Sequence, residues 1–127
     1  MKTRVDTKWY SNGQKKSEYN YKVGFCIFFT PFLKISFNVK EEGLETDWYK
    51  NGQKREETTY KDGKANGLNT GWYENGQKEW EVTWKDGKED GLWTHWYENG
   101  QKREETTYKD GKEISEQEWN DDGSLKN

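Results

Sequence analysis

A repeat of 24 residues is the feature that most constrains how this chain can fold. The segments GLETDWYKNGQKREETTYKDGK, GLNTGWYENGQKEWEVTWKDGK and GLWTHWYENGQKREETTYKDGK begin at Gly43, Gly67 and Gly91. Self-similarity at this spacing is typical of repeat proteins, in which each unit is one small structural element that stacks on the next. We therefore expect an elongated array of similar units.

The repeat continues in altered form on both sides of these three units. An earlier copy, RVDTKWYSNGQKKSEYNYKVG, begins at Arg4, and a shortened copy places Trp119 23 residues after Trp96. The prediction is a single repeat domain over residues 1–127. Its expected parts are units over residues 4–24, 43–66, 67–90 and 91–114, a partial unit over 115–127 and an insertion over 25–42.

Each unit predicts two strands and two tight turns. Asn-Gly and Asp-Gly recur at the repeat spacing, and both dipeptides favour type I′ turns because they tolerate positive φ at the two central residues. Between the turns the pattern has the period of two of a β-strand. Leu92, Thr94 and Trp96 share one face and recur in every full unit, whereas the alternate positions vary. We expect the first face to be packed and the other to be mostly solvated.

The predicted fold class is all-β. It is an elongated antiparallel β-meander or solenoid of about five 24-residue β-hairpin repeats with one inserted hydrophobic hairpin. Hydrophobic residues make up 28% and charged residues 35% of the chain, which by itself favours disorder. The eight Trp and eight Tyr residues argue against disorder and favour a thin sheet held by aromatic side chains.

Charge and the first residues predict the compartment and exclude some partners. The 21 basic and 24 acidic residues are interleaved, so no basic patch is available for nucleic acid or anionic lipid. The segment MKTRVDTKWYSNGQKK has no apolar stretch of the kind that a secretory signal needs. We expect a cytoplasmic protein.

The unit TYKDGKEDGLWTHWYENGQKREE resembles a MORN-type repeat (membrane occupation and recognition nexus). It resembles in particular a bacterial variant with WYENGQK and YKDGK segments, that of the YwqK-type toxin–antitoxin system antitoxins. The resemblance covers residues 4–24 and 43–126 and implies a hairpin-repeat scaffold that binds a protein, with a toxin as the candidate partner. The chain departs from the pattern at Glu57, Thr58 and Thr59, where a glycine is typical, and in residues 25–42, which have no counterpart.

The insertion is the most apolar part of the chain, GFCIFFTPFLKISFNVKEEG over residues 24–43. Trp9 and Trp48 are 39 residues apart, which is one repeat step plus 15. The apolar run is shorter than the roughly 20 residues of a membrane span, and its second half alternates as a half-buried strand does. We expect a two-strand hairpin that keeps the strand directions in phase. Three alternatives stay open: a hydrophobic plug over one face of the sheet, an exposed contact for a partner or lipid, or a segment that folds poorly.

The sequence contains no recognisable catalytic or metal-binding set. The one histidine, His95, stands where other units have Asp47 and Gly71, so an exposed strand position is expected. Nucleophilic catalysis requires a base beside the nucleophile, and the one cysteine, Cys26, lies in the apolar insertion as an expected buried hydrophobe. The sequence predicts a protein that is not an enzyme and that uses no cofactor or metal.

The third unit predicts a partner-binding surface. At three positions on one strand face it has Trp, Val and Trp where the second and fourth units have Glu, Thr and Tyr. A Trp and a His follow on the variable face of the next strand. Aromatic residues at such positions are typical of binding hot spots; alternatively, they pack against the inserted hairpin. With two residues of the insertion, the predicted partner-binding residues are Trp80, Val82, Trp84, Trp93, His95, Phe28 and Phe29.

Two functions are compatible with these features. The first is a non-enzymatic protein-binding repeat module, with an antitoxin or immunity protein that neutralises a toxin by direct binding as its specific form. The alternative is a membrane-peripheral or structural scaffold of the MORN type, which the net charge of −3 disfavours. The expected partner is a protein and not a nucleic acid or a membrane. The expected state is a monomer or a weak dimer paired through sheet edges. Lys and Glu residues discourage the pairing of sheet edges, so a dimer of this kind is expected to be weak.

Overall fold

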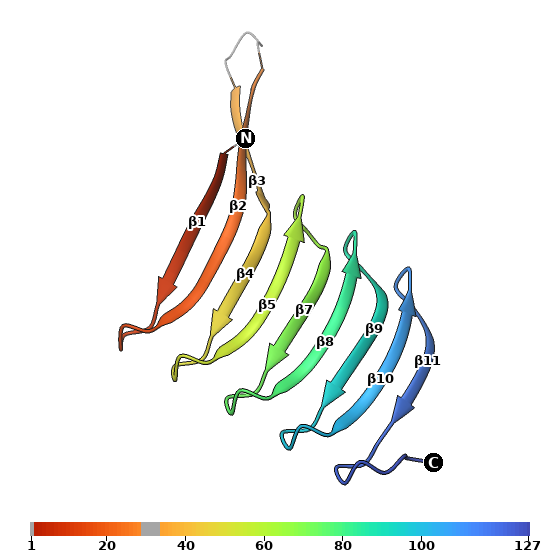
Figure 1. Cartoon of the computed structure of the whole chain (residues 1–127). Helices are drawn as coiled ribbons and strands as arrows, with labels where there is room; N and C mark the ends of the chain where they lie inside the picture. The colour runs from red at the N-terminus through yellow and green to blue at the C-terminus, as the bar shows by residue number, and fades with distance from the viewer. Residues whose placement is uncertain (1, 29–33) are drawn as a thin grey trace.

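The described residues of the chain form one antiparallel sheet of 11 strands (Figure 1). The computed structural model describes residues 2–28 and 34–127, with side chains over residues 2–24 and 38–127. The strands are β1 (Lys2–Trp9), β2 (Lys15–Phe28), β3 (Lys34–Glu41), β4 (Gly43–Trp48), β5 (Lys54–Lys61), β6 (Lys64–Ala65), β7 (Gly67–Trp72), β8 (Lys78–Lys85), β9 (Lys88–Trp96), β10 (Lys102–Lys109) and β11 (Lys112–Glu118). The predicted all-β meander of hairpin repeats is confirmed.

Strands that follow each other in the sequence are neighbours in the sheet. The order is β1-β2-β4-β5-β7-β8-β9-β10-β11, with β3 paired to β2 and β6 paired to β5. Strands β3 and β4 lie along the same neighbour, β2, and are separated at Glu42; β6 and β7 lie along β5 and are separated at Asn66. In the next unit β9 runs unbroken along β8. Each repeat therefore contributes one hairpin to a continuous sheet.

The two kinds of turn have different backbone conformations. Asp62, Asp86 and Asp110 have φ of 51° and are followed by glycines with positive φ, as the predicted type I′ turn requires. In the Asn-Gly turns only the glycine has positive φ, so the prediction of type I′ is wrong there. The Oδ1 atom of Asn51 accepts a hydrogen bond from the Gln53 amide at 2.9 Å, and this local bond holds the asparagine in an Asx turn.

The described part of the sheet has no conventional apolar core. Val82, at 4% exposure, is the one buried apolar residue among the described side chains. The other buried side chains are polar: Ser17, Thr46, Thr58, Asn69, Thr70, Thr94 and Thr106. In a single sheet the short side chains at the strand centres are shielded by their neighbours, while longer ones extend past them into solvent.

The prediction that the face with Leu92, Thr94 and Trp96 is packed is therefore wrong for the leucines. Leu92 is 44% exposed, whereas Thr94 is buried. The equivalent leucines of the second and third units are also exposed, because among the described residues no second layer covers this face. We call it the regular face, since its Leu, Thr and Trp residues recur, and we call the opposite side the variable face.

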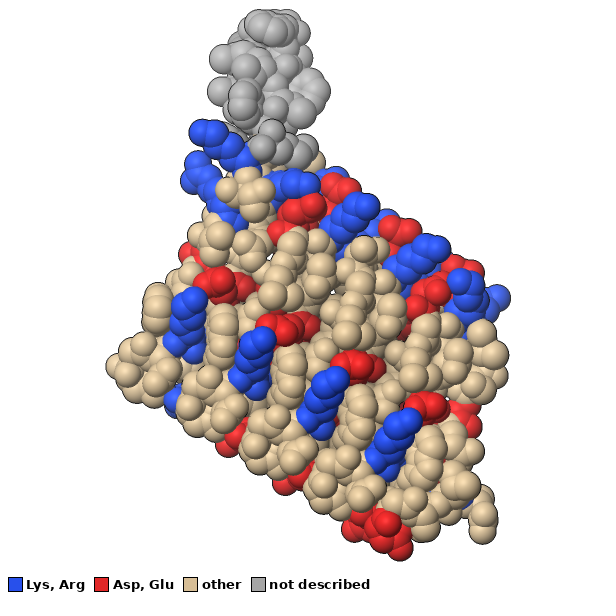
Figure 2. Space-filling model, viewed as in Figure 1, with Lys and Arg blue, Asp and Glu red and all other residues tan. Residues whose placement is uncertain are grey.

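Contacts between successive repeats recur along the sheet. The Oη atom of Tyr73 donates a hydrogen bond to the Trp96 carbonyl oxygen at 2.8 Å, and the equivalent tyrosines make the same bond. On the regular face, Lys54 pairs with Glu57 and lies 5.6 Å from the centre of the Trp72 ring. Three further Lys–Glu–Trp sets repeat this arrangement. Figure 2 shows such a regular series of neighbouring basic and acidic side chains across one face.

The inserted segment lengthens the first hairpin beyond the other hairpins. The pair Lys22↔Lys40 is equivalent to the last pair before the Asp-Gly turn of the next unit, Lys61↔Lys64. Residues 23–39 thus replace a turn of two residues, which gives the net insertion of 15. The described strands of this hairpin project past the row of Asp-Gly turns, and β3 pairs with β2 alone (Figure 1).

The expectation that this hairpin forms a plug over one face of the sheet is wrong for its described strands. The register between β2 and β3 continues without a shift from Tyr21 to Phe28, so no bulge turns the hairpin back over the sheet. The side chain of Cys26 lies outside the described residues. Within residues 2–28 and 34–127, the structure has no helix of the length and apolar character needed to cross a membrane.

Candidate functional site

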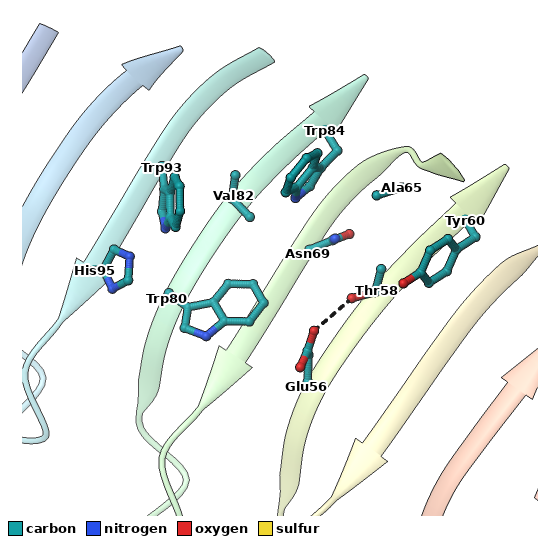
Figure 3. Close-up of a pocket in the computed structure, with 10 residues that line it drawn as sticks. All are labelled: Glu56, Thr58, Tyr60, Ala65, Asn69, Trp80, Val82, Trp84, Trp93 and His95. Atoms are coloured by element: carbon teal, nitrogen blue, oxygen red, sulfur yellow. Dashed lines mark hydrogen bonds between the residues drawn. The ribbon is translucent and has the colours of Figure 1, made fainter. Parts of the chain in front are cut away.

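A groove of about 420 Å³ lies on the variable face (Figure 3). Five of the predicted partner-binding residues line it together: Trp80, Val82 and Trp84 from β8, and Trp93 and His95 from β9. The neighbouring strands β5, β6 and β7 contribute the remaining lining residues, Glu56, Thr58, Tyr60, Ala65 and Asn69. That the five residues bind a partner stays a prediction.

Strand register brings these side chains to one side of the sheet. Trp80 is paired with His95, and Val82 with Trp93, and directly paired residues project to the same face. The alternative in which these aromatic residues pack against the inserted hairpin is wrong for the described strands of that hairpin. Strands β4, β5 and β7 lie between β8 and β2, the strand that carries the hairpin.

Gly71 makes room for the Trp80 side chain. A Cβ atom at Gly71 would lie 2.4 Å from Nε1 and Cε2 of the Trp80 indole, so the ring crosses the backbone of β7. Gly71 is paired with Trp80 on one side and with Glu56 on the other. The indole therefore extends over β7 in the direction of β5, as Figure 3 shows. Gly71 was not among the residues predicted from the sequence, although a glycine in the strand before the unit-specific tryptophan was a usable signal.

Val82 fits its position because Trp80 precedes it by two residues. In the second unit the Thr58 hydroxyl donates a hydrogen bond to Glu56 at 3.3 Å, and the fourth unit has the same Thr–Glu contact. With tryptophan in place of this glutamate, a threonine at position 82 would lose its acceptor. A buried hydroxyl without a partner is unfavourable, and valine has the same shape without the hydroxyl.

Trp93 and His95 form the end of the groove that lies on β9. Their ring centres are 5.3 Å apart, and the Trp93 ring is also 5.7 Å from that of Tyr108. His95 is half-buried, so the prediction of an exposed strand position is wrong. Burial lowers the pKa of His95, and the nearby Glu104 opposes this shift. The imidazole is therefore neutral at pH 7 and contributes an aromatic surface to the groove.

A smaller acidic pocket of about 150 Å³ adjoins the aromatic groove. It is lined by Glu45, Asp47, Glu56, Thr58 and Tyr60. Burial raises the pKa of Glu45 to about 7, and repulsion from Asp47, Glu41 and Glu56 adds to this shift. Asp47 is partly neutralised, because its Oδ2 atom accepts a hydrogen bond from Arg55 at 2.8 Å. This pocket was not predicted from the sequence.

The described residues contain no group of three or more His, Cys, Asp or Glu side chains that could hold a metal ion.

Two of the predicted partner-binding residues, Phe28 and Phe29, lie outside the described side chains. The backbone of Phe28 belongs to β2, but its side chain lies outside the described side chains, and Phe29 lies outside the described residues altogether.

Comparison with protein families agrees with the hairpin geometry. The profile of the MORN repeat variant family matches residues 7–22, 41–62 and 89–110. These three ranges are MORN repeats of the variant type. The matched ranges leave out residues 63–88, the part in which Trp80, Val82 and Trp84 replace the Glu, Thr and Tyr of the other units. MORN repeats are in general protein-binding or scaffold modules. The search of curated proteins and the search of solved structures found no match.

Proposed function

We propose that this MORN-repeat chain is a non-enzymatic protein-binding module whose partner docks on the aromatic groove of the variable face. The third unit carries this proposal. It keeps Leu68, Thr70 and Trp72, the residues of the regular face, but replaces the polar residues that its neighbours have at positions 80, 82 and 84. Since the second and fourth units form the same hairpin without these apolar side chains, the fold does not require them.

The composition of the groove supports a protein partner. Tryptophan is enriched among residues that dominate binding energy, and such residues are most effective in pockets that a partner closes to water. Trp80, Trp84 and Trp93 come from two adjacent, hydrogen-bonded strands, so little conformational freedom is lost when a partner covers them.

The specific form of the proposal is an antitoxin or immunity protein that neutralises a toxin by direct binding. Its basis is the resemblance of the WYENGQK and YKDGK segments to bacterial antitoxin repeats. Its test is growth. Co-expression of the chain should restore growth to cells that express a toxic product of a neighbouring gene. Failure of the chain to restore growth against every such product would remove this form and leave the general one in place.

The general form is tested with a triple variant, Trp80→Glu/Val82→Thr/Trp84→Tyr, which restores the residues of the neighbouring units. We expect it to fold, because the introduced glutamate and threonine would recreate the hydrogen bond that Thr106 makes with Glu104 in the fourth unit. Affinity capture with co-expressed genomic neighbours should retain a partner on the wild-type chain, and the variant should bind that partner at least about thirtyfold more weakly.

The control for this experiment is Leu68→Ala, because Leu68 is 53% exposed on the regular face. This variant should keep the partner. Circular dichroism and thermal unfolding would check that both proteins are folded. Retention of the partner by the triple variant, or loss of the partner from Leu68→Ala alone, would place the binding surface outside the groove and contradict the proposal.

A further inference from the structure

The aromatic groove and the acidic pocket form one continuous depression. Glu56, Thr58 and Tyr60 line both of them. A single row of paired residues crosses this region from β4 to β9: Asp47, Glu56, Gly71, Trp80 and His95. Because Gly71 has no side chain, nothing on β7 in this row separates the Trp80 indole from the carboxylate of Glu56. A ligand on the tryptophans therefore reaches the acidic pocket directly.

The acidic end of the depression is deficient in positive charge. Asp47 has Arg55 as an ion-pair partner, but among the described side chains no ion pair involves Glu45 or Glu56. Carboxylates that share a small pocket repel each other, and the raised pKa of Glu45 agrees with this crowding. A cation in the pocket would relieve the repulsion.

Glu45 is specific to the second unit, whereas Glu56 recurs as Glu104 in the fourth. The position of Glu45 is occupied by Asn69 in the third unit and by Trp93 in the fourth. The position of Glu56 is occupied by Trp80 in the third unit. In the second unit these two repeat positions hold Glu45 and Glu56, which lie at the acidic end of the depression. In the next two units they supply Trp80 and Trp93 to the aromatic end.

The groove tryptophans also lack the cations that cover Trp48, Trp72, Trp96 and Trp119 on the regular face. On the regular face, Lys54 lies over Trp72, and three further lysines lie over the equivalent rings. Among the described pairs of a cation with a ring, none involves Trp80, Trp84 or Trp93. No cation of the described side chains thus competes for these rings, although Trp93 also packs beside His95 and Tyr108, and a ligand cation over tryptophan is favourable.

We infer that the groove binds a basic, extended segment of the partner protein, with an arginine side chain between the tryptophans and the carboxylates of Glu45 and Glu56. This inference rests on the proposed function, because it specifies the ligand of the same groove. A guanidinium group fits both ends, since it stacks on aromatic rings and forms paired hydrogen bonds with a carboxylate. The four strand steps from β9 to β4 span about 19 Å at roughly 4.8 Å each, the length of about six extended residues.

The test uses two pools of fluorescein-labelled hexapeptides. Both pools vary Ala, Ser, Leu and Tyr at five positions, and the sixth position is arginine in one pool and citrulline, its neutral isostere, in the other. Fluorescence anisotropy with the full chain should show that the arginine pool binds at least about tenfold more tightly, because charge-assisted hydrogen bonds and cation–π contacts need the charge. The indole N–H signals of Trp80 and Trp84 in ¹⁵N NMR spectra should shift.

A matched pair of double variants locates the interaction. Glu45→Gln/Glu56→Gln should remove the preference for arginine and leave the affinity for the citrulline pool unchanged. The control Glu57→Gln/Glu81→Gln makes the same change in net charge on the regular face, where both carboxylates pair with lysines. This control should keep the full preference.

The possible outcomes separate this inference from the proposed function. If both pools bind equally and the Trp80→Glu/Val82→Thr/Trp84→Tyr variant loses both, the groove binds peptides but the arginine assignment is overturned. If neither pool binds, the arginine assignment is also overturned, and the capture experiment still decides the proposed function. If free arginine amide binds as tightly as the arginine pool, the depression takes a small cation, and the assignment to a partner segment fails.

Discussion

On the regular face a lysine, a glutamate and a tryptophan make the same contacts in four successive sets. On the variable face, equivalent positions hold Asp47, Gly71 and His95 in successive units. The same strands carry both faces, so their difference does not come from the backbone. It indicates that one face carries the contacts that join the repeats, while the other is free to differ from unit to unit.

A single-layer sheet makes this division possible. In a packed core a substitution disturbs neighbours on several sides of the side chain, because the interior is dense. Here each side chain contacts neighbours on its own face only, and the inter-repeat bond from Tyr73 to the Trp96 carbonyl lies at the turns. Stability that is distributed over contacts between neighbouring repeats is a general property of repeat proteins. The four predictions below test whether stability and binding separate between the two faces.

The largest effect on stability is expected for Trp72→Ala on the regular face. This change removes a half-buried ring and its contact with Lys54, so we expect the free energy of unfolding to fall by about 3 kcal/mol. Urea unfolding followed by circular dichroism measures it. The control Leu68→Ala removes a side chain that is already 53% exposed and should cost less than about 1 kcal/mol. Equal losses for the two variants would contradict the role assigned to the repeated tryptophan.

Gly71→Ala should weaken binding at the groove by about tenfold while changing stability little. The new Cβ atom would meet the Trp80 indole at 2.4 Å, so the ring has to leave β7 and the surface that it offers to a ligand is lost. Gly71 is not among the residues with positive φ, so alanine introduces no backbone strain. Anisotropy with the arginine peptide pool measures the loss.

A double-mutant cycle provides the control for Gly71→Ala. In the Trp80→Glu background the same substitution has no indole to displace, and it should leave the remaining affinity unchanged. An equal loss in both backgrounds would show that Gly71 acts through the backbone and not through Trp80.

Tyr73→Phe should lower the free energy of unfolding by about 1 kcal/mol. It removes the hydrogen bond of 2.8 Å to the Trp96 carbonyl, and one such bond contributes about that amount. Binding at the groove should not change, because this contact joins repeats. Tyr108→Phe is the control, since among the described residues the Tyr108 hydroxyl makes no hydrogen bond, and it should cost distinctly less. A loss of peptide affinity in Tyr73→Phe would show that the two faces are coupled.

The smallest effect is a change of affinity with pH. Burial and neighbouring carboxylates raise the pKa of Glu45 to about 7, so this group is mostly protonated at pH 6 and mostly ionised at pH 8. Binding of the arginine pool should therefore strengthen several-fold between these values. The charged and titratable groups around Glu45 are Asp47 on β4, Glu41 on β3, Glu56, Arg55 and Tyr60 on β5, and Lys8 on β1.

The same group has the opposite effect on folding. Because its folded pKa is above the value in an unfolded chain, Glu45 contributes stability at low pH that is lost as the pH rises through about 7. Glu45→Gln should remove most of both pH dependences. An affinity that is flat from pH 6 to pH 8 in the wild-type chain would show that Glu45 does not face the bound cation.

Local features of the sequence were sufficient for most of the fold. The Asp-Gly turns were predicted correctly, since both turn residues adopt positive φ. The Asn-Gly turns were not, because the Asn51 side chain makes its own bond to the backbone, which the dipeptide rule does not include. The inserted hairpin was found by its spacing, but whether it turns back over the sheet depends on the register of β2 and β3.

The candidate site was predicted in part, because only some of its residues stand out in the sequence. Trp80, Val82 and Trp84 stand out by comparison between repeats, and the period of two places them on one face. The acidic pocket was missed. Glu45 and Glu56 are ordinary residues of a charged chain, and nothing in their local sequence says that they share a pocket.

The sequence by itself determined the repeat length, the hairpin unit, the two faces and the unit that deviates, because each is a regularity along the chain. The tertiary structure alone decided which deviations meet. Trp80 extends over Gly71 towards Glu56, 24 residues away in the sequence. The physical reason is that alternation specifies the face of a side chain, whereas its neighbours across the sheet depend on strand register and on the space that each neighbour leaves.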